Sequence, residues 1–121
     1  MNYILISAPI IGILALIFAF YKASSIDKIK PGNDRMQEIS KYIQDGAMAF
    51  LSRQYKSLGI FVVALFIILT FVPGLGFKTA ICFLIGALFS VAAGYIGMRV
   101  ATKANVRTAN AAMESGMNKA L

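Results

Sequence analysis

The fold is decided by residues 58–98, which read LGIFVVALFIILTFVPGLGFKTAICFLIGALFSVAAGYIGM. Leu58–Val72 and Thr79–Met98 are apolar apart from hydroxyl groups and small residues, and neither contains a charged residue. Pro73-Gly74-Leu75-Gly76, between them, favours a turn that stops a helix. The first segment is short for a span, and it can gain length from its flanks, where aromatic rings suit the membrane interface. The pattern predicts membrane spans over about 57–72 and 79–100, joined as an antiparallel hairpin.

A further apolar segment lies near the amino terminus, at residues 3–21, and it also lacks charge. As a helix it would be about 28 Å long, which matches a hydrocarbon core of ~30 Å. Pro9 is tolerable there because neighbouring helices can satisfy the carbonyl that it leaves unpaired. A cleaved signal peptide is the alternative, but no Lys or Arg precedes the segment and Lys22 follows it. We therefore predict a third span over 3–21.

Composition agrees with a membrane protein. The chain has 121 residues, of which 59% are hydrophobic and 14% charged, against the ~25% charge of a typical soluble domain. A net charge of +7 would suggest nucleic acid in a soluble protein, but here it suggests an anionic membrane surface, and we expect no nucleic-acid partner. There is no His, which removes the commonest general base and the commonest transition-metal ligand. The one cysteine, Cys82, cannot form a disulfide within the chain. The predicted fold class is an all-α polytopic membrane protein with three transmembrane helices.

The basic residues predict the orientation. Of the 12 Lys and Arg residues, all but Lys78 lie between the first and second spans or after the third span. Three spans place those two regions on the same side, and the positive-inside rule makes that side cytoplasmic. We expect the amino terminus outside and the carboxyl terminus in the cytoplasm.

Residues 34–56 read as a cytoplasmic amphipathic helix that runs straight into the second span. Its apolar positions, spaced as on one helix face, are Met36, Ile39, Ile43, Ala47 and Phe50. Asp34, Glu38 and Asp45 lie opposite, with Lys41 among them. They could form a Mg²⁺ or polyanion site, or a solvated face with ion pairs at helical spacing, and the second interpretation is favoured because nothing forces the carboxylates to converge. Asn33 or Asp34 can cap the first turn.

The third span carries small residues at four-residue spacing. Gly86, Ser90 and Gly94 form one row, and Ala93, Gly97 and Ala101 form another. Such rows let helices approach closely, which predicts packing against more helices than two sibling spans provide. A substrate pathway lined by small residues is the less favoured alternative.

Beyond the third span the helix is predicted to continue as a cytoplasmic tail over about 101–115, and Ser115-Gly116 is a plausible stop. Arg99, Lys103 and Arg107 form a basic stripe along this tail. The stripe could bind a phosphorylated substrate, but lipid headgroups are the favoured partner of basic residues at this position.

Two stretches resemble a known family: Asp45–Tyr55 (DGAMAFLSRQY) and Gly94–Ala112 (GYIGMRVATKANVRTANAA). They are similar to the amino-terminal part of the membrane-bound, ion-translocating inorganic pyrophosphatases, and Ala104–Ala112 is the most specific part. The resemblance covers essentially the whole chain. It implies a pump that couples pyrophosphate hydrolysis to H⁺ or Na⁺ export, with several Mg²⁺ ions and K⁺ as a further candidate ion. It also implies a larger helical bundle, a homodimer and a bacterial or archaeal cell membrane.

In that family the residues that bind Mg-pyrophosphate, and those that gate the ion, lie on later helices. The resemblance therefore assigns no catalytic, cofactor-binding or metal-binding residue to residues 1–121, with Mg²⁺ bound elsewhere in the pump. The expectation is an amino-terminal fragment, truncation or split product that is inactive alone and supplies outer helices. The residues leave other functions open: a small self-associating scaffold or regulatory protein in the membrane, or a lipid-sensing hairpin. They do not choose between H⁺ and Na⁺, or decide K⁺ dependence.

Overall fold

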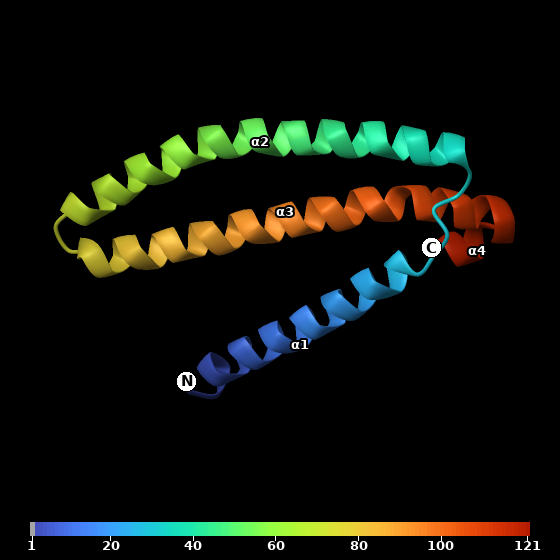
Figure 1. Cartoon of the computed structure of the whole chain (residues 1–121). Coiled ribbons are helices and arrows are strands. Elements are labelled where there is room, and N and C mark those ends of the chain that lie inside the picture. The colour runs from blue at the N-terminus through green and yellow to red at the C-terminus, as the bar shows by residue number, and fades with distance from the viewer. Residues whose placement is uncertain (1) are drawn as a thin grey trace. The chain divides into compact units, whose positions relative to one another are not determined.

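The computed structural model describes residues 2–121, which form helices without any strand (Figure 1). The helices are α1 (Asn2–Asp27), α2 (Asp34–Phe71), α3 (Gly76–Ser115) and the short α4 (Met117–Ala120). The first three are long and apolar enough to cross a membrane. The all-α class with three membrane-spanning helices is confirmed.

The start of α2 follows from its capping residues. The Asn33 side-chain oxygen accepts a hydrogen bond from the Met36 backbone N–H at 2.9 Å, so Asn33 is the N-cap. The Gln37 side-chain amide donates to the Gly32 carbonyl at 3.1 Å, which ties the preceding loop to the first turn. From Asp34 the helix continues for 38 residues, through the amphipathic segment and the apolar segment without a break.

The turn between α2 and α3 uses its glycines as the sequence suggests. Gly74 and Gly76 have φ of +93° and +68°, in the left-handed region that other residues rarely adopt. α3 therefore begins at Gly76, ahead of the predicted span at 79, and runs through the predicted tail to Ser115. Which parts of α2 and α3 lie inside the membrane stays a prediction.

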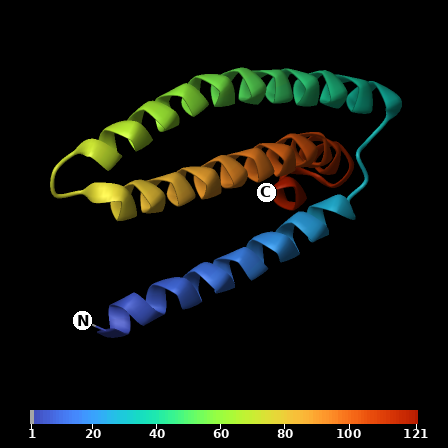
Figure 2. The ribbon, with the colours of Figure 1, turned by 60° about the vertical axis from the view of Figure 1, so that its left-hand side comes forward.

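The chain divides into two compact units. One comprises Glu38–Thr102, and the other comprises the residues up to Gln37 together with Lys103–Leu121. In the first unit α2 and α3 run side by side as an antiparallel hairpin, which both views show (Figure 2).

The contact between α2 and α3 has the spacing of near-parallel helices. The less exposed positions of α3 in this unit include a row spaced by three, four or seven residues, which lies on one helix face: Ala80, Leu84, Ala87, Val91, Met98 and Thr102. Ala80 is fully buried, and Leu51 of α2 is 6% exposed. Near the turn, the rings of Phe66 and Phe77 meet edge to face with centroids 6.4 Å apart. This spacing explains how two long helices pair without a large core.

α1 is longer than the predicted span because it continues past Tyr21 to Asp27. Its apolar side chains are exposed almost without exception, with Tyr3 at 88% and Phe20 at 82%. Such a surface is stable only when lipid or further protein covers it. This exposure agrees with the finding that α1 is apolar enough to span a membrane.

Candidate functional site at the junction of α1 and α3

Polar contacts in the second unit join the end of α1 to the tail of α3. The Lys103 ammonium lies 3.3 Å from an Asp27 carboxylate oxygen. The Arg107 Nε–H donates to the Ile29 carbonyl at 3.0 Å, and its Nη1 donates to the Lys103 carbonyl at 2.9 Å. Carbonyls just beyond a helix end lack partners within the helix, so the α3 side chains supply donors that α1 cannot. The loop after α1 is thereby attached to α3.

Asn110 is the most buried polar residue of this junction, at 3% exposure. Its amide donates to the Lys30 carbonyl at 3.4 Å. The loop passes close to it at Gly32, where φ is +90° and an added Cβ would lie 3.3 Å from the Asn110 oxygen and 2.8 Å from the Met36 sulfur. Glycine is thus required at position 32 both for its conformation and for the close approach to α3.

The basic stripe has a structural role that the sequence analysis did not anticipate. Lys103 and Arg107 bind atoms of the chain itself, and the Arg99 guanidinium lies over the Tyr95 ring at 5.8 Å. Lys103 remains 45% exposed, so its ion pair with Asp27 is a surface pair of modest strength. Lys103 and Arg107 are therefore first of all part of the junction, whereas Arg99 contacts a ring of its own helix.

A cavity of about 300 Å³ lies within this unit, between α1, α3 and the segment after α3. Its residues follow helical spacing on both walls, because i, i+3, i+4 and i+7 share one face. They are Lys22, Ser25, Ile26 and Ile29 on one wall, Ala104, Arg107, Thr108 and Ala111 on the other, and Lys119, Ala120 and Leu121. The cavity exists because alanines of α3 leave room where larger side chains would fill the space.

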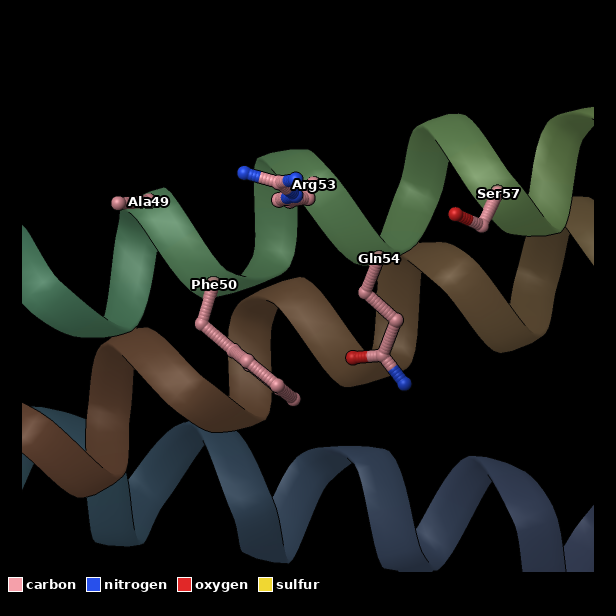
Figure 3. Close-up of a pocket in the computed structure, with 5 residues that line it drawn as sticks. All are labelled: Ala49, Phe50, Arg53, Gln54 and Ser57. Atoms are coloured by element: carbon pink, nitrogen blue, oxygen red, sulfur yellow. The ribbon is translucent and has the colours of Figure 1, made fainter.

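A second hollow, of about 560 Å³, lies on α2 in the hairpin unit. Figure 3 shows that Phe50 and Gln54 extend from the same side of α2, and Ala49, Arg53 and Ser57 complete the lining. All five residues come from one helix, so the hollow has no opposing wall. It is a surface for contact rather than an enclosed site for a small molecule.

The acidic residues of α2 are not grouped as the ligands of a metal ion would be. In the part of the chain that the structure describes, no three His, Cys, Asp or Glu side chains gather where they could hold a metal ion. The Glu38 carboxylate accepts a hydrogen bond from the Tyr42 hydroxyl at 3.2 Å. Magnesium prefers several oxygen ligands in a nearly octahedral arrangement. That this face is a solvated surface rather than a magnesium site stays a prediction.

The pairing of Asp27 with Lys103 was not predicted from the sequence. Asp27 and Lys103 are 76 positions apart, and no local pattern joins them. Asn110 lies inside the family-like stretch 104–112, and that stretch was the one available signal for it. Its burial and its bond to the loop explain why a polar residue occupies that position.

The comparisons with known proteins agree with this architecture. A family model described as inorganic H⁺ pyrophosphatase matches residues 13–121. The chain is 52% identical over 115 residues to a putative K⁺-stimulated pyrophosphate-energized sodium pump of Clostridium tetani, covering 95% of this chain and 17% of that protein. It is 43% identical over 121 residues to a K⁺-insensitive pyrophosphate-energized proton pump of Methanosarcina mazei, covering 100% of this chain and 18% of that protein.

A K⁺-insensitive pyrophosphate-energized proton pump of Moorella thermoacetica is 46% identical over 116 residues, which cover 93% of this chain and 16% of that protein. No solved structure matches the chain. The chain thus spans less than a fifth of the length of these relatives. The match of the family model over residues 13–121 nevertheless shows that the chain belongs to the inorganic H⁺ pyrophosphatase family.

Proposed function

We propose that the chain is part of a pump that couples hydrolysis of inorganic pyrophosphate to export of H⁺ or Na⁺ across a membrane. In this proposal it supplies outer helices of the pump and lacks the active site. The observation that carries it is the similarity along nearly the whole chain to proteins named as such pumps. Those relatives bear both proton-pump and sodium-pump names, so the proposal includes either ion.

The surface of the chain supports a place within a larger bundle. The apolar residues of α1 are exposed, and an added Cβ at Gly86 or Gly97 of α3 would meet no atom within 4 Å. Small residues on an uncovered helix face leave room for another helix to approach closely. We propose that the remaining helices of the pump cover these positions.

The metal chemistry belongs to the rest of the pump in this proposal. Magnesium would neutralise the charge of pyrophosphate, and residues outside this chain would hold it, as they would any K⁺. A homodimer and the cell membrane of a bacterium or archaeon, with the amino terminus outside, complete the proposal. The open glycine rows also favour a second candidate, a membrane scaffold that associates with its own copies.

Complementation tests the proposal. The chain is expressed together with a second chain that carries the part of the Clostridium tetani pump it does not match, and membranes are assayed for phosphate release from pyrophosphate and for ion uptake. We expect activity with both chains and none with either alone. Full activity of the second chain alone, with stable homo-oligomers of the first, would favour the scaffold.

A second test asks whether the acidic residues of α2 hydrolyse pyrophosphate without the rest of the pump. Pyrophosphate hydrolysis by the purified 121-residue chain, abolished by changing Asp34, Glu38 and Asp45 together to their amides, would contradict the proposal. That result would place the chemistry on α2.

A further inference from the structure

The cavity between α1 and α3 gathers positive charge. Lys22, Arg107 and Lys119 line it, and none of the lining residues that the structure describes has an acidic side chain. In the 121-residue chain the carboxylate of Leu121 also lies at the cavity, where three cations outnumber it. Ser25 and Thr108 add two hydroxyl groups. Like charges around one small space repel one another unless an anion lies between them.

Arg107 and Lys22 contact neutral groups at this cavity. Arg107 uses two of its five N–H groups to bind backbone carbonyls, which fixes the guanidinium at the cavity wall. The Lys22 ammonium lies over the Phe18 ring, 5.6 Å from its centroid. A carbonyl or a ring face orients a cation but leaves its charge uncompensated.

The position of the cavity suits the membrane surface. Lys22 directly follows the charge-free residues 3–21, and lysines at the end of an apolar helix extend toward the lipid headgroups. Ile26 and Ile29, which line the same cavity, give it an apolar edge. A headgroup phosphate on a lipid whose tails run beside α1 would meet both features.

We propose that this cavity binds a phosphate group, delivered either by the headgroup of an anionic lipid or as free phosphate. Lys22, Arg107 and Lys119 provide the charge, and Ser25 and Thr108 provide hydroxyl donors. Arg107 is also part of the junction, so the bound phosphate attaches the end of α1 to the tail of α3 more firmly. The proposal concerns this chain alone and does not depend on its place in a pump.

The test uses the 121-residue chain in an uncharged detergent. Native mass spectrometry follows its binding of phosphatidylglycerol, with phosphatidylcholine as the zwitterionic comparison. The cavity variant carries Lys22→Gln with Lys119→Gln, and the control carries Lys28→Gln with Lys56→Gln, an equal change of charge at exposed lysines that do not line the cavity. Far-UV circular dichroism checks that both variants stay helical.

We expect phosphatidylglycerol to bind better than phosphatidylcholine, and the cavity variant to bind it about 30-fold more weakly than the unchanged chain. The control should change the affinity by less than about threefold, because Lys28 and Lys56 do not line the cavity and screening weakens the effect of a distant charge. Displacement of the lipid by inorganic phosphate would identify free phosphate as a ligand, whereas retention would identify the lipid.

Two results would overturn the proposal. Equal loss in the cavity variant and the control would show that binding reflects overall charge rather than this cavity. Unchanged affinity in the cavity variant, or equal binding of the two lipids, would show that the cavity does not recognise a phosphate anion.

Discussion

Tyr55 of α2 reaches the backbone of α3 beside Gly94. The Tyr55 hydroxyl donates to the Val91 carbonyl at 2.9 Å, and an added Cβ at Gly94 would lie 3.2 Å from that hydroxyl. Gly94 therefore makes room for the ring of α2, whereas Gly86 in the same row has no neighbour within 4 Å. One small-residue row thus serves the hairpin at one position and stays open at another.

Replacing Gly94 with Leu should destabilise the isolated hairpin more than the same change at Gly86. At position 94 a larger side chain displaces Tyr55 and separates the helices, while at position 86 it enters open space. Thermal unfolding of the 121-residue chain in detergent, followed by circular dichroism, measures the difference. If other helices cover Gly86 in the assembled pump, Gly86→Leu should also be harmful there. Size-exclusion chromatography of the pump would then show impaired assembly. Equal melting temperatures for the two variants of the isolated chain would contradict the close approach at Gly94.

Removing the Tyr55 hydroxyl should weaken the hairpin slightly. Tyr55→Phe keeps the ring and loses the hydrogen bond to Val91, and bonds between membrane helices contribute about 0.6 kcal/mol on average. Reversible unfolding in mixed micelles measures the free energy of unfolding. Tyr42→Phe, which removes a hydroxyl bonded within α2 alone, is the matched control and should leave the hairpin contact unchanged.

Among the elements, the loop between α1 and α2 is held by the tail of α3. The buried amide of Asn110 reaches the Lys30 carbonyl, and the exposed carboxylate of Asp27 reaches Lys103. Desolvated hydrogen bonds are costly to break, whereas exposed ion pairs contribute little. The attachment should therefore depend more on Asn110 than on Asp27.

Asn110→Ala should loosen this loop, with a loss of about 1–3 kcal/mol in local stability. Asp27→Asn should have a much smaller effect because both partners of its ion pair face solvent. Hydrogen–deuterium exchange at residues 28–33 measures the opening of the loop. Faster exchange in Asp27→Asn than in Asn110→Ala would mean that the ion pair holds the junction.

Local signals predict where the long helices begin and end. Asn33, the Pro73–Gly76 turn and Ser115-Gly116 each act through neighbours within a few positions, and the helices stop or start at them. The extension of α1 to Asp27 was not predictable in this way. Asp27, at its last turn, contacts Lys103, 76 positions away, and helical periodicity carries no information about such distant contacts. The cavity was missed for the same reason, since its walls belong to distant segments.

At the scale of the whole molecule, burial within the chain is slight. Over residues 3–121 the buried hydrophobic residues are Leu51, Ala80 and Val106. A soluble domain of this size would bury most of its large apolar side chains. The environment of the helices, rather than a core of their own, must therefore cover them.

The predicted orientation can be tested on intact cells. Single cysteines at Ser24, Leu75 and Ser115, in a chain whose exposed Cys82 is replaced, are treated with a thiol reagent that does not cross membranes. We expect labelling at position 75 alone, because nearly all basic residues lie on the side of the other two. Leu75 is preferred to Gly76, whose positive φ would strain a cysteine. Labelling at position 24 would reverse the assignment.

The length of α2 affects how motion is transmitted along the molecule. Its 38 residues form an unbroken helix about 57 Å long, nearly twice the ~30 Å thickness of a hydrocarbon core. A helix of that length acts as a stiff lever, since its hydrogen-bond ladder resists bending unless a Pro or a bulge interrupts it. A tilt of about 5° in the part within the bilayer would move the far end by roughly 2–3 Å, because some 30 Å of helix extends beyond the core. If residues 34–56 lie outside the bilayer, as the sequence predicts, small motions among lipid-embedded helices would reach that part of α2 enlarged rather than damped.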